Sequence, residues 1–169
     1  NIPFMSVKVT GFARFGLLER IDSLMKASGN QSLIVAYNNA LQQLSAEELN
    51  EWNRVYERTK RVCEVAKQKG IGVLVDAEET WIQDPVDALT TLMMEACNKE
   101  KVVVYNTIQL YRHDRLAFLK ESFQIAQERQ FVLGAKLVRG AYMEKERKRA
   151  EEKGYPSPIQ PNKEASDRD

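Results

Sequence analysis

The sequence has 169 residues, of which 43% are hydrophobic and 29% are charged, enough for one ordinary domain or part of a larger one. Its 25 basic and 24 acidic residues leave a net charge of +1. This balance argues against nucleic acid or an anionic membrane as an electrostatic partner. No apolar run reaches the roughly 20 residues of a membrane-spanning helix. The first residues also lack the pattern of a signal peptide.

The first predicted element is a strand over residues 4–11, ended by a glycine. A helical insertion over about residues 12–44 follows, with helical stretches over residues 15–27 and 32–44. A long helix comes next. Ser45 and Glu48 have the spacing of a capping box at its start, and Gly70 stops it.

Three further strands and two helices complete the pattern. Asp84 is predicted to cap one helix, with Pro85 in its first turn, and Asp114 to begin the other, with Phe123 on its apolar face. A final, highly charged helix is expected to expose most of its surface to solvent. The three apolar strands are predicted over residues 71–79, 101–106 and 131–138.

The last three strands follow one another at intervals of about 30 residues, the length of a βαβ unit. Strands this apolar suit a parallel sheet covered by helices. The sequence contains neither a GxGxxG fingerprint nor a Walker A run, so a Rossmann or P-loop fold has no support. The pattern therefore favours an α/β fold of the (β/α)₈ barrel type, whose working residues lie at the carboxyl ends of the strands.

Polar residues do lie at the predicted carboxyl ends of all four strands. A single such residue is most often a turn or cap, and Glu78 and Glu79 are interpreted as a loop or helix-start pair in this way. A lysine inside an apolar strand is different, because it must find an acid, a ligand or water. The residues at these ends include Lys8, Asp76, Asn106, Gln109, Lys136, Arg139 and Tyr142.

Few other residues are candidates for chemistry. Cys63 and Cys97 form no CxxC pair and lie on apolar helix faces, so we interpret them as core residues in a reducing compartment. His113 is the only histidine and is expected at the surface or at a helix start. No cluster of metal-ligating residues surrounds it, so no metal site is expected.

Four motifs carry a resemblance to a known family. The stretches MSVKVTG, VLVDAEETWIQ, VVYNTIQLYRHD and GAKLVRGAYMEKERKRAEEKGYPSPIQPNKEASDRD resemble consecutive motifs of the proline dehydrogenases, in family order. The phrasing is closest to the single-function, mitochondrial-type branch and its bacterial relatives. The resemblance implies a (β/α)₈ barrel, of which residues 1–169 would hold about the second to fifth β/α units of one catalytic domain.

The resemblance also implies a function. The family oxidises L-proline to Δ1-pyrroline-5-carboxylate with FAD and passes electrons to a membrane quinone. Such a protein would sit peripherally on the cytoplasmic face of a bacterial membrane, or at the mitochondrial inner membrane or matrix. The family's substrate-binding arginines on its final helix, and the strands for the adenosine end of FAD, have no counterpart here. Unpaired edges of a partial barrel would favour self-association.

Residue by residue, the resemblance assigns three groups of positions. Asp76 and Lys136 match active-site residues, and Lys8, Leu137 and Tyr142 match residues around the substrate. A cation near a flavin stabilises the charge of its reduced state, and small residues let backbone approach a flat ring. The matched cofactor positions are Ala77, Gln109, Val138, Arg139, Gly140 and Ala141.

Two alternatives remain open from the residues alone. Lys8 or Lys136 could act as the nucleophile of an aldolase-type barrel enzyme, through a Schiff base, if one of them were desolvated to a low pKa. The chain could also be a non-catalytic interaction module, in which the polar residues at the strand ends only cap turns and helices. Its charged helix would then bind a partner.

Overall fold

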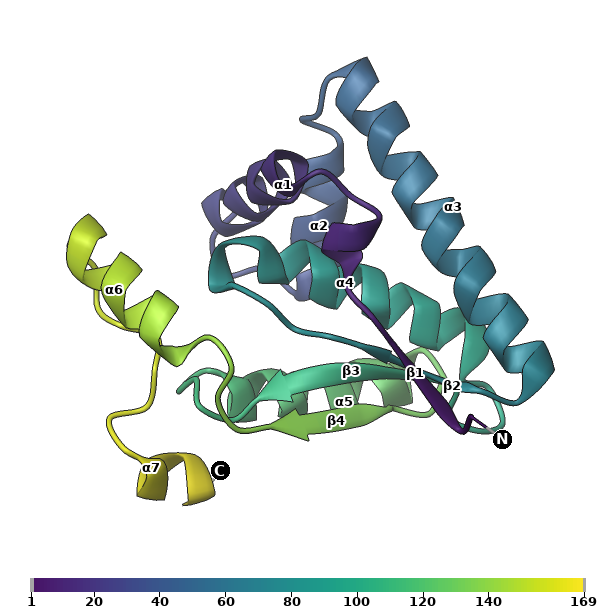
Figure 1. Ribbon diagram of the computed structural model, residues 1–169. Coiled ribbons are helices and arrows are strands. Elements are labelled where there is room, and N and C mark those ends of the chain that lie inside the picture. Colours follow the sequence, from purple (N-terminus) through teal and green to yellow (C-terminus); the bar gives the residue numbers. More distant parts are fainter. Residues whose placement is uncertain (1, 169) are drawn as a thin grey trace.

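The computed structural model describes residues 2–168 and contains a four-stranded, all-parallel sheet with strand order β1-β2-β3-β4 (Figure 1). Each strand pairs with the next in the sequence, as in consecutive units of a (β/α)₈ barrel. The strands are β1 (Phe4–Val7), β2 (Gly72–Val75), β3 (Val104–Gln109) and β4 (Ala135–Val138).

Helices connect the strands and cover one face of the sheet. α3 packs against β2, α4 and α5 pack against β3, and α1 and α2 pack on α4 as a further layer (Figure 1). A short 3₁₀ turn, η1 (Val9–Gly11), follows β1. The helices are α1 (Phe15–Ala27), α2 (Leu33–Leu41), α3 (Ala46–Lys69), α4 (Thr80–Cys97), α5 (Arg115–Glu128), α6 (Met143–Lys153) and α7 (Lys163–Arg168).

The hydrophobic core lies between the sheet and these helices. Val73 and Val75 of β2 and Val104 of β3 are buried there against Leu89 and Met93 of α4. Fully burying one such side chain contributes about 1.5–3 kcal/mol. The alternation of side chains along each strand leaves the other face of the sheet for the polar residues described below.

Several sequence predictions are confirmed. α1 spans the predicted residues, and Ser45 and Glu48 form the full capping box of α3. Gly70 ends α3 with a φ of +67°, a left-handed conformation that glycine adopts without strain. Cys63 and Cys97 are buried free thiols.

The start of α4 differs from the prediction. The helix begins at Thr80, so Pro85 lies inside it and Asp84 is not its cap. The carboxylate of Glu146 in α6 accepts hydrogen bonds from the backbone N–H of Thr80 at 2.7 Å and from its hydroxyl at 2.8 Å. A distant residue therefore caps α4, and local sequence could not reveal it.

Other boundaries also shift. β1 ends at Val7 because the chain turns into η1, and β3 continues to Gln109, beyond its predicted end. β4 begins only at Ala135, after Gly134, where an added Cβ would lie 2.3 Å from the carbonyl oxygen of Val104. In α5, Phe123 is 55% exposed rather than turned inward.

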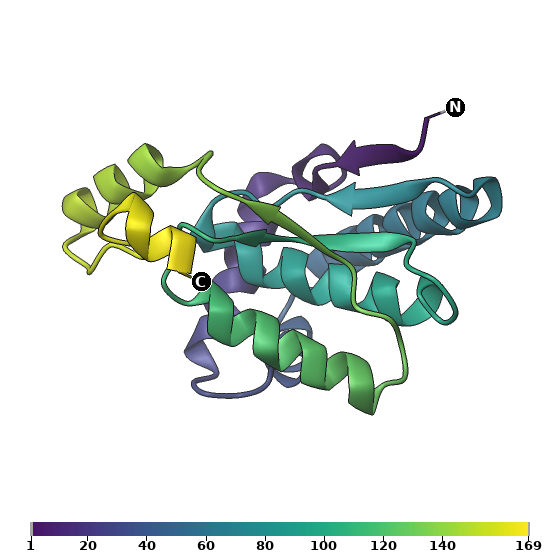
Figure 2. The ribbon, with the colours of Figure 1, turned by 90° about the horizontal axis from the view of Figure 1, so that it is seen from below.

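The four strands point the same way, and α6 and α7 lie beyond their carboxyl ends (Figure 2). α6 is therefore in place to cover the end of the sheet where barrel enzymes carry their sites. Between residues 2 and 168, no helix combines the length and apolarity that crossing a membrane requires.

Candidate active site

A cavity of about 340 Å³ opens at the carboxyl ends of the strands. All four strands and the start of α6 contribute to it, so it combines segments far apart in the sequence. Its lining residues are Lys8, Asp76, Ala77, Thr107, Tyr111, Lys136, Val138, Ala141 and Tyr142.

The register of the sheet explains why polar side chains meet in this cavity. Val7 pairs with Val75, Val75 with Asn106, and Thr107 with Lys136. One residue further along, Lys8, Asp76, Thr107 and Lys136 therefore form a row across the four strands. Successive residues alternate between faces, so this row lies on the face opposite the buried valines.

Asp76 is the centre of this row. The Nζ of Lys136 donates to Oδ1 of Asp76 at 2.5 Å, and the Nζ of Lys8 lies 3.6 Å from Oδ2. Two ammonium groups share this one carboxylate, and the charge of a second acid, Glu78, also acts on Lys8. The side chain of Lys8 is 50% exposed, so it can bind an incoming anion such as a substrate carboxylate.

The surroundings keep Lys8 charged. Burial lowers the pKa of Lys8, but Tyr142, Glu78 and Asp76 together raise it further, and the resulting pKa lies above the ordinary value. Burial and the charge of Glu78 likewise raise the pKa of Tyr142. At neutral pH the cavity thus presents an ammonium group and a neutral phenol.

Gln109 is placed differently from the other candidate residues. Its side chain is buried behind the cavity, and its Nε2 donates to the backbone oxygen of Glu78 and to the hydroxyl of Tyr111, both at 2.7 Å. Its Oε1 accepts from Arg112 at 3.2 Å. Every donor and acceptor of the amide therefore has a protein partner, and a contact with a flavin stays a prediction.

A buried network of ion pairs supports Gln109. Arg112 donates to Asp114, and Arg115 donates to Asp114 at 3.0 Å and to Asp87 at 2.8 Å. Burial raises the pKa of Asp114, but the two arginines outweigh it and hold that pKa well below its usual range. Buried charges that pair in this way fix the end of β3.

Three of the candidate residues lie away from the cavity. Leu137 projects from the opposite face of β4 to Lys136 and is 58% exposed, so it does not cover the cavity. The guanidinium of Arg139 pairs with Asp167 of α7. Gly140 has a φ of +154°, and an added Cβ there would lie 2.8 Å from the sulfur of Met143.

Two acids lie in the loop before α4, as the sequence predicts, but both are buried. Glu78 is only 8% exposed, and its carboxylate accepts from the hydroxyl of Thr10 at 2.7 Å. Glu79 is also buried and pairs with Lys145 of α6. Their position directly after an apolar strand was the one signal that pointed to burial at the site.

Comparison with known proteins identifies the family of this chain. A model of the family described as proline dehydrogenase matches residues 3–169. The chain belongs to the proline dehydrogenase family. It is 42% identical over 126 residues to "Proline dehydrogenase 1, mitochondrial" of Caenorhabditis elegans, which covers 75% of this chain and 20% of that protein.

A second relative, the hydroxyproline dehydrogenase of Xenopus laevis, is 31% identical over 175 residues, covering 98% of this chain and 38% of that protein. This chain therefore spans only a part of the curated proline dehydrogenases that it resembles.

Solved structures of proline utilization A (PutA) show the same fold. The PutA from Bdellovibrio bacteriovorus inactivated by N-propargylglycine aligns with a TM-score of 0.70 and 22% identity, over 96% of this chain and 14% of that one. A bifunctional PutA protein aligns with a TM-score of 0.71 and 20% identity, over 98% and 14%. The expected α/β fold of a partial (β/α)₈ barrel is thus confirmed.

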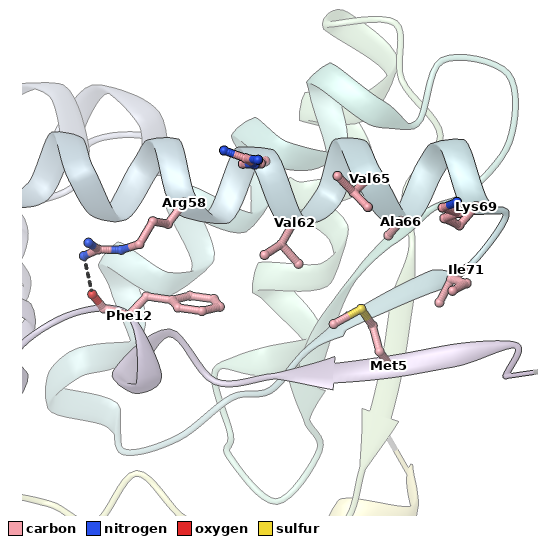
Figure 3. Close-up of a pocket in the computed structure, with 9 residues that line it drawn as sticks. Met5, Phe12, Arg58, Val62, Val65, Ala66, Lys69 and Ile71 are labelled. Atoms are coloured by element: carbon pink, nitrogen blue, oxygen red, sulfur yellow. Dashed lines mark hydrogen bonds between the residues drawn. The ribbon is translucent and has the colours of Figure 1, made fainter.

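A second cavity, of about 450 Å³, lies between β1 and α3 (Figure 3). Met5, Phe12 and Val62 form its apolar floor, and Arg58 crosses its rim to donate to the backbone oxygen of Phe12 at 2.8 Å. No acid lines it, and its cations lie at the rim. Convergent polar groups distinguish a reaction site from an apolar groove, so the cavity around Asp76 is the candidate active site.

Proposed function

We propose that the full-length protein containing this chain oxidises L-proline to Δ1-pyrroline-5-carboxylate, with FAD as cofactor and a membrane quinone as final electron acceptor. Residues 1–169 would be part of its catalytic barrel domain, with residues 12–44 as a helical insertion. The observation that carries this proposal is the row formed by Lys8, Asp76, Thr107 and Lys136 in a cavity at the strand carboxyl ends.

The residues present fit a flavin in chemical terms. FAD, when bound, accepts a hydride from the substrate carbon. The ammonium groups of Lys8 and Lys136 suit an electron-rich ring, and Ala77 and Ala141 add little side-chain bulk at the cavity wall. The volume of about 340 Å³ suits a ring system or a small substrate rather than a whole dinucleotide.

Different side chains bind different parts of proline. Lys8 pairs with the carboxylate, because it is the half-exposed cation of the row. Val138 and Tyr142 line the cavity with apolar surface that can cover the pyrrolidine ring. Asp76 holds both lysines at the site and keeps them from turning toward solvent.

The geometry does not favour the aldolase-type alternative. A Schiff-base lysine must lose its proton to become a nucleophile. Lys8 and Lys136 are both paired with Asp76, and the pKa of Lys8 is raised rather than lowered. The ammonium group of Lys8 is therefore stabilised in the protonated form, and that of Lys136 is held by the carboxylate of Asp76.

The location of the protein is also a proposal. Relatives from animals carry mitochondrial in their names, and a quinone acceptor requires access to a membrane. We propose peripheral contact with the mitochondrial inner membrane in a eukaryote, or with the cytoplasmic face of the membrane in a bacterium. The outer edges of β1 and β4 lack a strand partner among residues 2–168, and in a partial barrel they would favour self-association.

The test is an assay of the full-length protein with proline and an artificial electron acceptor. We expect proline-dependent reduction of the acceptor and a flavin absorbance spectrum that bleaches when proline is added without oxygen. Hydroxyproline and other amino acids serve as comparison substrates. Oxidation of other amino acids without any oxidation of proline would refute the proposal.

A further inference from the structure

Glu78 is a buried acid to which neither the family motifs nor the cavity lining assigns a role. It follows Asp76 and Ala77 directly, but its side chain turns behind the cavity wall. Its backbone is held on both sides. The N–H donates to Oε1 of Gln83 at 2.8 Å, and the carbonyl accepts from Gln109 at 2.7 Å. The residue therefore has little freedom to move.

Hydroxyl groups, rather than a cation, satisfy the carboxylate of Glu78. Thr10 donates to Oε1 at 2.7 Å, and the hydroxyl of Tyr142 donates to Oε2 at 3.4 Å. Within residues 2–168, no lysine, arginine or histidine nitrogen lies within 4.0 Å of this carboxylate, whereas neighbouring Glu79 pairs with Lys145. A buried carboxylate needs such donors, and it fixes their direction in return.

Tyr142 connects Glu78 to the cavity. Its hydroxyl donates to Glu78, and its side chain lines the cavity together with Lys8, whose pKa Tyr142 helps to raise. A phenol has a single hydrogen to donate, so the hydrogen that points to Glu78 does not point into the cavity. Glu78 therefore fixes the direction of a hydroxyl group beside Lys8.

We propose that Glu78 is a positioning residue that acts through Tyr142, fixing the direction of the phenol hydroxyl beside Lys8, the cation that faces a substrate carboxylate in the cavity. This inference rests on the proposed function, because the carboxylate at Lys8 is that of proline. With a neutral side chain at position 78, the phenol hydrogen can turn toward the cavity. Tyr142 then competes with Lys8 for the substrate carboxylate.

The test is a double-mutant cycle in the full-length protein, with Glu78→Gln, Tyr142→Phe and both together. We expect each single variant to raise the KM for proline about tenfold and to change kcat by less than about threefold, the effect of one charge-assisted hydrogen bond. If Glu78 acts through Tyr142, the double variant is no worse than Tyr142→Phe alone. Additive losses would overturn the proposal.

Glu79→Gln is the matched control. Glu79 is the same residue type, adjacent and equally buried, but its carboxylate faces Lys145. We expect this variant to leave the KM for proline within about twofold of the parent, an ordinary margin for a change outside the site. If Glu78→Gln does not fold, Thr10→Val removes one donor and leaves the charge. It should raise the KM in the same direction by a smaller factor, and an unchanged KM would overturn the proposal.

A second readout does not depend on turnover. The hydroxyl of Tyr142, labelled as 3-fluorotyrosine and assigned with Tyr142→Phe, can be titrated by ¹⁹F NMR. Burial first, and then the charge of Glu78, raise the pKa of Tyr142, so Glu78→Gln should lower it and Glu79→Gln should lower it less. An unchanged titration in Glu78→Gln would overturn the proposal. If the parent protein does not oxidise proline, the proposed function fails, and the titration still decides the role of Glu78.

Discussion

Lys136 reaches Asp76 from two strands away, across Thr107 of β3, and this contact defines the chemistry of the cavity. Its ammonium is partly buried, so its charge acts through a less polar medium than bulk water. Such a positive charge has its largest effect on negative charge that develops during a reaction, and its smallest effect on negative charge that water already solvates. Lys8, at the more exposed end of the row, is instead suited to binding.

This contrast predicts the effect of Lys136→Met in the full-length protein. We expect kcat for proline oxidation to fall by about 10- to 100-fold and the KM to change much less, because the lysine helps the transition state more than the bound substrate. Steady-state kinetics over a range of proline concentrations measures both. Lys120→Met, at an exposed position of α5, is the control. A raised KM with an unchanged kcat would contradict this role.

Among the helices, α6 differs most from the solvent exposure that its sequence predicts. Its residues are almost all charged, which predicts a solvated helix. Yet Glu146 is 1% exposed and caps α4 through Thr80, and Arg149 stacks on Trp81 at 4.0 Å. These contacts clamp α6 across the end of the sheet and place Tyr142 at the cavity.

Glu146→Ala should therefore destabilise the protein. The variant leaves the half-buried N–H of Thr80 without its acceptor, which typically costs about 1–3 kcal/mol when the group is shielded from water. Chemical denaturation measures the change in the free energy of unfolding, and hydrogen exchange of the Thr80 amide reports it locally. Glu144→Ala, which removes an exposed acid of the same helix, should change stability by less than about 0.5 kcal/mol. Equal losses from the two variants would contradict the capping role.

The contact between α1 and α4 contains a carboxyl with an unusual pKa. Asp22 of α1 accepts from the backbone N–H of Asp84 at 3.2 Å and from Lys26 at 2.5 Å. Burial and the nearby Asp84 raise the pKa of Asp22 from 3.8 to about 6, and Lys26 offsets only part of this. The folded state therefore holds the proton more tightly than the unfolded state does.

The resulting pH dependence has a definite sign. Asp22 favours the folded state most below pH 3.8, and this contribution is lost as the pH rises to about 6. A shift of about two pKa units corresponds to about 3 kcal/mol. Asp22→Asn should remove this contribution. The free energy of unfolding of the variant, relative to that of the parent, should therefore increase from pH 4 to pH 6. Denaturation curves at several pH values measure it, and a constant difference would contradict the prediction.

For the whole molecule, the four strands form one wall of a site. The chain covers 20% of its Caenorhabditis elegans relative and 14% of the aligned PutA structures, and in the described part the cavity has no opposite wall. A substrate carboxylate paired with the half-exposed Lys8 gains only about 0–1 kcal/mol, as exposed ion pairs do. Closed sites exclude water and make each such contact stronger.

The 169 residues by themselves should therefore show no proline oxidation and only weak retention of FAD. The measurement is to purify this chain, supply excess FAD, and assay it with proline and a dye acceptor beside the full-length protein. Turnover within about tenfold of the full-length rate, a difference of only about 1.4 kcal/mol in the barrier, would show that these strands carry the complete site.

The sequence by itself determined the order of elements, the boundaries of α1 and α3, and the row of Lys8, Asp76 and Lys136 at the strand ends. These depend on local signals. Hydrophobic periodicity, a capping box and a terminal glycine act within a few residues, and parallel strands bring their carboxyl ends together without further information. The family motifs added the match to proline dehydrogenase, which the comparisons confirmed.

Only the tertiary structure decided the placement of Gln109, Leu137, Glu78 and Glu146. Gln109 and Glu78 are held by partners about 30 and 65 residues away, and Leu137 faces away from the cavity because β4 alternates its side chains about Lys136. Glu146 looks solvated in sequence, but the first turn of α4 has backbone donors that need an acceptor. The free energy of burying these polar groups depends on which distant groups reach them, and composition and periodicity do not encode that.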